Sequence, residues 1–422
     1  MKRSLWKLVR RTGADRLGPG LITGAADDDP SGIATYSQAG AQFGFGMLWT
    51  VIFTFPLMTA IQMVSARIGH VTHHGLAANM RRAFPHWVTL VVVALLLAAN
   101  TLNVAADIAA MGEALQLLVD GASAIYSVTF GLLCLVLQVF LPYERYVRWL
   151  KWLTLALLSY VAVAFMIEID WREVGWRVLM PGLSLNRSSL LMIVAVFGTT
   201  ISPYLFFWQA AQEMEDVRAA TSGSPTTESV RHHLRRIQWD TVVGMGMSNL
   251  IAFFIILATA ATLHAQGATE IETAAQATEA LRPLAGNFTF ALFALGIIGT
   301  GLLAVPVLAG SAAYAAAEAL GFEGSLSARL EQGEGKGFYA IIALATLGGV
   351  ALSLTPAGAV KELFWAAVLN GIIAVPIMAV MMLLAGRREL MGDHIVDGKL
   401  RLLGWFATLV MAGAVVGMLL TA

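Results

Sequence analysis

The sequence predicts an all-helical integral membrane protein with about eleven membrane-spanning helices. Of its 422 residues, 58% are hydrophobic and only 13% are charged, about half of the ~25% charged residues typical of soluble domains. Apolar segments of about 20 residues, the length that crosses a bilayer, recur along the whole chain. We therefore expect a single transmembrane domain over residues 1–422, with no large soluble domain.

Each predicted helix is an apolar segment bounded by polar residues, glycine or proline. The first and the sixth helices are interrupted by polar residues and a proline. The polar stretches 212–237 and 265–286 are predicted to be loops. The helices are predicted at 18–42, 47–68, 87–117, 123–141, 146–168, 188–211, 238–264, 287–318, 337–355, 360–385 and 401–421.

Basic residues predict the orientation of the chain, because Lys and Arg gather in cytoplasmic loops. If the N-terminus is cytoplasmic, 22 of the 27 Lys and Arg residues fall on the inside. Residues 1–17 then form a basic cytoplasmic leader, and an odd number of helices puts the C-terminus outside. We expect a multi-pass protein of the cell membrane. Its zero net charge gives no field to attract nucleic acid.

The two interrupted helices are the most informative segments. They read GLITGAADDDPSGIATYSQAG at 20–40 and LMIVAVFGTTISPYLFFWQAAQE at 191–213. Pro30 and Pro203 each remove a backbone donor and break the helix. Carbonyl groups freed at membrane depth are tolerated only where they line a cavity or bind something. Each interruption is therefore a candidate binding site.

Broken helices in corresponding positions of two halves indicate a transporter. Here helices one and six each open a unit of five helices, at 18–168 and 188–385, and helix 401–421 is left over. An odd number of helices per unit inverts the second unit relative to the first. This predicts the leucine-transporter arrangement, in which the carbonyls freed at the breaks bind cations.

Three consecutive aspartates, Asp27, Asp28 and Asp29, precede Pro30. An aspartate at the centre of a membrane helix costs ~2.5–3.5 kcal/mol, whereas a Leu or Ile returns only ~0.3–0.6 kcal/mol. The triplet must therefore face a polar cavity or an interface. Asp29 is the strongest candidate for a cation ligand, and Asp28 and Asp27 are candidates to add a second carboxylate or to attract cations at the mouth of the site. The alternative is that Asp29 only caps the second half-helix, with proline at its first position.

At these two interruptions the sequence resembles the Nramp family of divalent-metal transporters. The resemblance rests on Asp-Pro-Ser-Gly at 29–32, Ile-Ala-Thr at 33–35, Gln-Ala-Gly at 38–40 and Ser-Pro-Tyr at 202–204. It continues at the positions Gln62, 65–69, 106–109, Asp240 and 387–392. The resemblance implies the eleven-helix leucine-transporter fold, alternating access, and a metal ion held between helices one and six.

Carried over position by position, the resemblance implies metal ligands at Asp29 and at the backbone carbonyl near Thr199 and Thr200. The asparagine ligand of the family falls on Gly32, its methionine on Ser202 and its following histidine on Tyr204. Loss of the thioether favours hard cations such as Mg²⁺ and Mn²⁺, which prefer carboxylate, carbonyl and water. The chain thus resembles a divergent branch of the family.

Helix three leaves proton coupling open. Asp107 matches a family acid and, as an intramembrane acid, is a candidate proton or ion relay. Two other acidic positions of the family fall on Asn100 and Ala110. Asn249 and Asn370 are candidates to line the site, although helix-bridging amides are commoner. The alternative for Asp107 is a structural role with hydroxyl or amide partners.

The sequence thus predicts a secondary transporter for a divalent cation, Mn²⁺ or Mg²⁺, and not an enzyme. The metal ion is the substrate, no cofactor is implied, and protons are an open second partner. The alternatives are an amino-acid or other organic-solute symporter on the same fold and a sensor that keeps a transporter fold. The sequence does not determine the oligomeric state.

Overall fold

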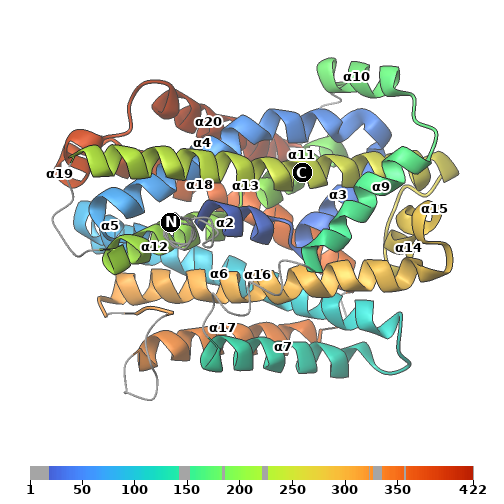
Figure 1. Cartoon of the computed structure of the whole chain (residues 1–422), viewed down its shortest axis with the longest axis horizontal. Coiled ribbons are helices and arrows are strands. Elements are labelled where there is room, and N and C mark those ends of the chain that lie inside the picture. Colours follow the sequence, from blue (N-terminus) through green and yellow to red (C-terminus); the bar gives the residue numbers. More distant parts are fainter. Residues whose placement is uncertain are drawn as a thin grey trace, which may run out of the picture.

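A computed structural model describes residues 19–141, 153–182, 186–220, 227–322, 324–326, 335–355 and 358–421. All regular structure in these ranges is helical. The predicted leader at 1–17 and the beginning of the predicted helix 146–168 lie outside these ranges. The longer helices run roughly along the longest axis of the molecule (Figure 1).

The predicted segments appear as helices, and most of their ends lie close to the predicted ones. Both interrupted helices are divided in two, as expected. The membrane segments are α2 Pro19–Asp27 with α3 Pro30–Phe43, α4 Leu48–Thr72, α6 His86–Gln116, α7 Ser123–Phe140, η2 Leu153–Leu157 with α9 Leu158–Met166, α11 Arg187–Thr200 with α12 Pro203–Ala220, α13 Thr227–Thr262, α16 Thr289–Leu320, α17 Lys336–Ser353, α18 Ala359–Ala385 and α20 Gly398–Leu420.

Nine helical stretches in the described ranges are long and apolar enough to cross a membrane. One of them, Pro30–Thr72, joins the second half of predicted helix one to helix two. The predicted fifth helix appears as the shorter apolar stretch Leu155–Met166. These segments account for the eleven that the sequence predicts.

The polar stretches are more helical than predicted. α12 continues to Ala220, and α13 already begins at Thr227, because the amphipathic ends of both helices extend beyond the apolar core. The segment 265–286 contains the short helices η3 His264–Gln266, α14 Ala274–Thr278, η4 Glu279–Leu281 and α15 Arg282–Ala285. Three further helices connect the long ones: α5 Leu76–Ala83, α10 Trp171–Leu179 and α19 Arg388–Met391.

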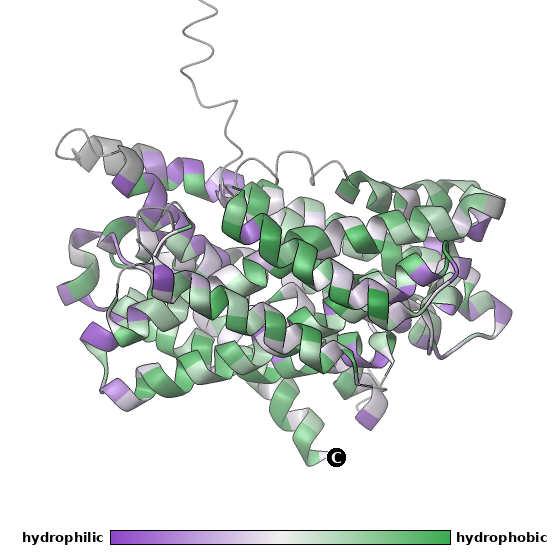
Figure 2. Cartoon of the chain, turned by 90° about the horizontal axis from the view of Figure 1, so that it is seen from below, coloured by the Kyte–Doolittle hydropathy of each residue, from purple (hydrophilic) through white to green (hydrophobic). Residues whose placement is uncertain are grey.

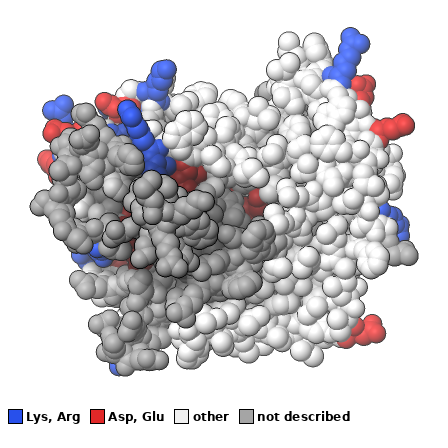
Figure 3. Space-filling model, viewed as in Figure 1, with Lys and Arg blue, Asp and Glu red and all other residues white. Residues whose placement is uncertain are grey.

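The surface carries the signature of a membrane protein. Hydrophobic residues dominate the middle of the long helices, and hydrophilic residues gather towards the ends of the molecule (Figure 2). On the face drawn in Figure 3, most of the visible Lys, Arg, Asp and Glu side chains lie towards the left and right ends. Large apolar side chains such as Phe165, Leu344 and Leu409 are exposed, as lipid-facing residues should be.

Glycine contacts pack the first half of each broken helix closely against a neighbouring helix. A Cβ atom on Gly24 of α2 would lie 2.3 Å from the backbone carbonyl of Gly244 of α13. A Cβ atom on Gly198 of α11 would lie 2.5 Å from the backbone nitrogen of Gly371 of α18. Each pair therefore packs backbone against backbone, which only glycine permits. This packing fixes the positions of both breaks.

Candidate metal centre

The first break lies between α2 and α3, at Asp28 and Asp29. Asp29 caps α3: its Oδ1 accepts a 2.7 Å hydrogen bond from the backbone N–H of Gly32, and Pro30 occupies the first turn. The predicted capping role is therefore present. Asp27, Asp28 and Asp29 are 1%, 3% and 2% exposed, so the whole triplet faces the interior and not lipid or water.

The second break lies between α11 and α12, at Ile201 and Ser202. Ser202 Oγ lies 2.9 Å from the carbonyl oxygen of Thr199 and 3.0 Å from that of Gly198, and its single hydrogen donates to one of them. Thr200 Oγ1 donates to the carbonyl of Val196 at 2.9 Å. The hydroxyl groups of this break thus satisfy carbonyls of their own helix, while Ser202 Oγ keeps lone pairs that accept no hydrogen bond from the part of the chain that the structure describes.

The two breaks meet through Tyr204. Its hydroxyl lies 3.0 Å from the carbonyl oxygen of Ala26, at the end of α2, and 3.2 Å from Asp29 Oδ2. A Cβ atom on Gly32 would lie 3.2 Å from Thr199 Oγ1, so the start of α3 also approaches the end of α11. The structure therefore brings together the residues around both prolines, although they are more than 170 positions apart in the chain.

Asp107 of α6 joins this group from the side. It is fully buried, and neither carboxylate oxygen has a hydrogen-bond partner. The negative charge of Asp29 is close enough to act on Asp107, and the backbone N–H of Ser31 lies near both carboxylates. The predicted alternative, an acid satisfied by neighbouring hydroxyl or amide groups, is not what this geometry provides.

Asp27 and Asp28 turn to α13 and not to the second break. Ser248 Oγ lies 2.5 Å from Asp27 Oδ2 and 3.0 Å from Asp28 Oδ1. Sequence reasoning missed Ser248. The signal that pointed to it was the pair of polar residues at 248–249 inside an apolar helix, from which only Asn249 was chosen.

Four buried asparagine side chains on α6, α13 and α18 form hydrogen bonds to neighbouring helices. Asn249 donates to the carbonyl of Val51 on α4 at 2.8 Å. Asn370 and Asn103 exchange two side-chain hydrogen bonds of 3.0 and 3.1 Å between α18 and α6. Asn100 donates to Ser311 Oγ and to the carbonyl of Leu308 on α16. All four amides therefore bridge helices, and in these bonds none donates to a residue of the two breaks.

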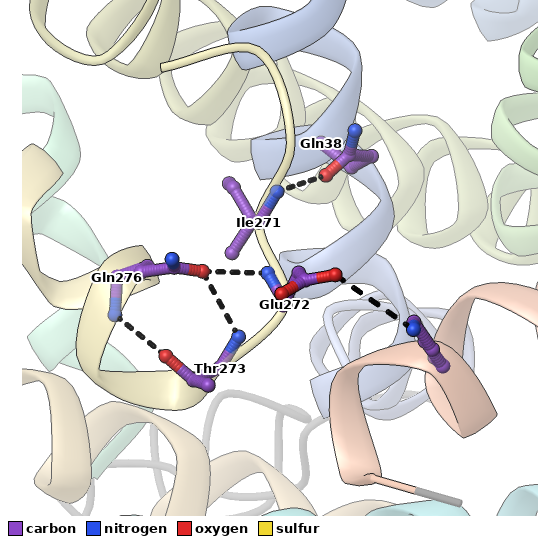
Figure 4. A network of polar contacts seen from close by, with 6 residues as sticks. Gln38, Ile271, Glu272, Thr273 and Gln276 are labelled. Carbon is purple, nitrogen blue, oxygen red and sulfur yellow. Dashed lines mark hydrogen bonds and ion pairs between the residues drawn. The ribbon is translucent and has the colours of Figure 1, made fainter.

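The segment 265–286 covers the end of α3 that points away from the first break (Figure 4). Gln38 accepts from the backbone N–H of Ile271 at 2.8 Å and donates to the carbonyl of Thr269 at 3.2 Å. Thr273 and Gln276 form a capping box at the start of α14. Glu272 reaches Lys361 of α18 at 3.8 Å. Under this segment lies a cavity lined by Ile33, Ser37, Ala110, Glu113, Ile271 and Leu363.

No group of three or more His, Cys, Asp or Glu side chains in the described part of the chain is arranged to hold a metal ion. A cation at the breaks would therefore depend on one or two carboxylates together with carbonyl and hydroxyl oxygens. Such all-oxygen ligand sets suit hard cations.

The family comparison decides the class of the protein. The sequence model of the family described as natural resistance-associated macrophage protein-like matches residues 20–421. The chain belongs to the Nramp family. Members of this family are transporters, so this multi-pass membrane protein is a transporter and not an enzyme.

Relatives and solved Nramp structures agree with the fold. A divalent metal cation transporter MntH of Yersinia enterocolitica is 26% identical over 96% of this chain and 94% of its own length. One of Aeromonas hydrophila is 27% identical over 68% and 69%. The manganese transporter of Eremococcus coleocola has a TM-score of 0.77 at 14% identity, covering 96% of this chain and 85% of its own.

A second class of transporter shares the architecture. The nucleobase-cation-symport-1 family transporter Mhp1 has a TM-score of 0.57 at 14% identity and covers 96% of this chain and 93% of its own. The predicted fold class, a leucine-transporter-like bundle with helices one and six broken, is confirmed.

Proposed function

We propose that this Nramp protein is a secondary transporter that carries a divalent cation, Mn²⁺ or Mg²⁺, across the cell membrane by alternating access. The observation that carries the proposal is the position of Asp29. Its carboxylate is buried where the two broken helices meet, and Tyr204 joins it to the second break. A carboxylate buried at this depth in a membrane protein is stabilised by a bound cation. The Yersinia and Aeromonas relatives named as divalent metal cation transporters support this choice.

The proposed ligands are Asp29, a carbonyl oxygen at Thr199 or Thr200, and Ser202, completed by water. Gly32 and Tyr204 line the same site. The single hydrogen of Ser202 is directed at the carbonyl oxygens of its own segment, so the lone pairs of its oxygen can still coordinate a cation. A site of carboxylate, carbonyl and hydroxyl oxygens without a thioether favours Mg²⁺ and Mn²⁺ over soft metals.

Proton coupling, if present, would run through Asp107. Its two oxygens have no hydrogen-bond partner, and the charge of Asp29 acts on it. Asn100 is engaged between α6 and α16, and Ala110 carries no titratable group. A coupling proton would therefore have a shorter chain of acids here than the family pattern provides.

The proposed orientation puts the start of α2 on the cytoplasmic side and segment 265–286 outside, with inward transport. The units 18–168 and 188–385 would then rock against each other as inverted repeats. On the outside, Gln38 holds segment 265–286 over the cavity at Ser37 and Glu113. On the inside, Asp240 Oδ2 accepts from the backbone N–H of Gly20 at 2.7 Å and holds the start of α2.

The test is uptake into proteoliposomes that contain the purified chain and a pH dye, with Mn²⁺, Mg²⁺, Fe²⁺ and Cd²⁺ offered in turn. We expect uptake of Mn²⁺ or Mg²⁺, with little transport of Cd²⁺, and loss of uptake in Asp29→Ala. Uptake by Asp29→Ala at the wild-type rate would refute the site. Acidification of the lumen during uptake would establish proton coupling. Uptake of an amino acid in place of any metal would favour the symporter alternative.

A further inference from the structure

Four buried aspartates lie around the first break without a basic partner. Among the residues that the structure describes, no Lys or Arg side chain is buried. Each uncompensated buried charge costs several kcal/mol, so the group must be neutralised by bound cations or protons. The four carboxylates form two pairs: Asp29 with Asp107 near the Ser31 amide, and Asp27 with Asp28 at Ser248.

We propose that Asp27, Asp28 and Ser248 form a second cation site, distinct from the site at Asp29. The inference rests on the proposed cation transport, because it names a further binding site on the same pathway. Two carboxylates and one hydroxyl are hard oxygen ligands, so the site would take Mg²⁺ or Mn²⁺.

The geometry at Ser248 carries the argument. A serine hydroxyl has a single hydrogen to donate, yet Ser248 Oγ lies within hydrogen-bond distance of two different carboxylates. One of these two oxygen–oxygen contacts therefore lacks a hydrogen of the serine. Two oxygens in contact without a hydrogen between them repel each other. A cation bound by the three oxygens would replace this repulsion with coordination bonds.

A second observation points to the same place. Asp27 Oδ1 is buried and has no hydrogen-bond partner, and the whole Asp27 side chain is only 1% exposed. An unsatisfied buried carboxylate oxygen costs more than a neutral group, because it keeps its charge without solvation. Helix capping does not explain this atom, since Asp29 is the residue that caps α3.

The packing of α2 on α13 makes the site conditional. The two helices run in parallel and touch at Gly20 with Thr241, then at Gly24 with Gly244. Asp27 and Asp28 reach Ser248 one turn further on. The second site therefore exists only while α2 lies along α13. A cation bound there would hold this half-helix in place and keep the proposed cytoplasmic side closed.

The test is the number of Mn²⁺ ions bound by the purified full chain in detergent, from equilibrium dialysis and electron paramagnetic resonance. We expect two Mn²⁺ per wild-type chain, with spectra broadened because two paramagnetic ions lie close together. Asp27→Asn combined with Asp28→Asn should leave one Mn²⁺ and sharpen the spectrum. Asp29→Ala should also leave one ion, the one at the second site.

Ser248→Ala keeps both carboxylates and so tests the geometry if the double aspartate variant does not fold. It should weaken the second Mn²⁺ about tenfold, which corresponds to about 1.4 kcal/mol. Ser353→Ala, which removes a hydroxyl bonded only to the Val350 carbonyl, is the matched control and should bind two ions normally.

Three outcomes would overturn the second site. A wild-type chain that binds a single Mn²⁺ would mean that protons neutralise the pair. The other two are retention of both ions after loss of Asp27 and Asp28, and unchanged Mn²⁺ binding in Ser248→Ala. If instead Asp29→Ala keeps both ions, the proposed site at Asp29 fails. Loss of one ion in the Asp27/Asp28 variant would still support the second site.

Discussion

The two breaks solve the same backbone problem with different chemistry. At the second break, Ser202 and Thr200 donate to carbonyls of α11, and side chains of α4 satisfy α12: Gln62 donates to the carbonyl of Leu205 at 2.8 Å and Ser65 to that of Phe206. At the first break the polar groups are carboxylates, and Asp27 Oδ1 has no partner.

This difference suggests a structural role for the second break and a cation-binding role for the first. A break whose carbonyls are bonded by neutral hydroxyl and amide groups is stable without a ligand. A break with unpaired buried carboxylates is not, because the charge must be compensated. In the proposed site, the first break would therefore supply most of the affinity for the cation, and the second would supply oxygen ligands in fixed positions. The following variants test this division.

The largest effect is expected from Asp29→Asn compared with Ser202→Ala. The amide keeps the size of the side chain but removes the charge, so we expect Mn²⁺ or Mg²⁺ uptake to fall about 100-fold, or about 2.8 kcal/mol. Ser202→Ala removes a neutral ligand and should cost less than tenfold. Initial uptake rates in proteoliposomes measure both. Equal losses of uptake in the two variants would show that the two breaks contribute equally to cation binding.

The next effect concerns packing. In Gly24→Val the new side chain would overlap the backbone of Gly244, where even a Cβ atom would be 2.3 Å away. Overpacking of this kind costs about 1–3 kcal/mol, so the thermal unfolding midpoint in detergent should fall. Gly413→Ala is the control, since nothing lies within 4 Å of its added Cβ. A Gly24→Val protein as stable as Gly413→Ala would show that α2 does not pack closely on α13.

A smaller effect is expected at the supporting helix. Gln62→Leu keeps the volume but leaves the carbonyl of Leu205 without its 2.8 Å donor. A buried unpaired acceptor costs about 1–3 kcal/mol, so stability should fall while the apparent affinity for the metal stays unchanged. Thermal unfolding and the KM of uptake separate the two. A large rise in KM would place Gln62 in the binding site itself.

The smallest effect is expected at segment 265–286. The ion pair between Lys361 and Glu272 is 64% and 60% exposed and spans 3.8 Å, and such pairs contribute about 0–1 kcal/mol. Lys361→Gln should therefore leave uptake almost unchanged at 0.15 M salt. Gln38→Ala removes two hydrogen bonds to the same segment and should have the larger effect. The reverse order would mean that charge, and not the Gln38 clamp, holds the segment.

Local signals predicted the breaks well, because proline and aspartate leave few choices inside a membrane helix. Asp29 and Pro30 predicted the interruption and offered the cap as an alternative, and both are present. The ends of α12 and α13 were less predictable, because amphipathic helix that extends beyond the membrane resembles a loop in hydropathy. The partners across helices were the least predictable.

Side-chain partners depend on which face of each helix packs inward, and periodicity is weak in helices that are apolar all round. Asn249 and Ser248 are neighbours in the chain, yet Ser248 faces Asp27 and Asn249 faces Val51. Asn370 is predicted as a candidate to line the site, and its side chain exchanges hydrogen bonds with Asn103. Hydropathy does not distinguish the face of α13 that carries Ser248 from the face that carries Asn249. The close contact of Gly24 with Gly244 does, because it fixes which face of α13 lies against α2.

The cap on α3 has a consequence for ion selectivity. In the proposed site, the hydrogen bond from the backbone of Gly32 to Asp29 Oδ1 would restrain the carboxylate from moving to follow ions of different radius. Binding an ion there freezes little side-chain motion, so preorganisation favours affinity. The same rigidity makes the fit depend on ionic size, and the larger Ca²⁺, which prefers longer bonds and more ligands than Mg²⁺, should be rejected on geometry alone.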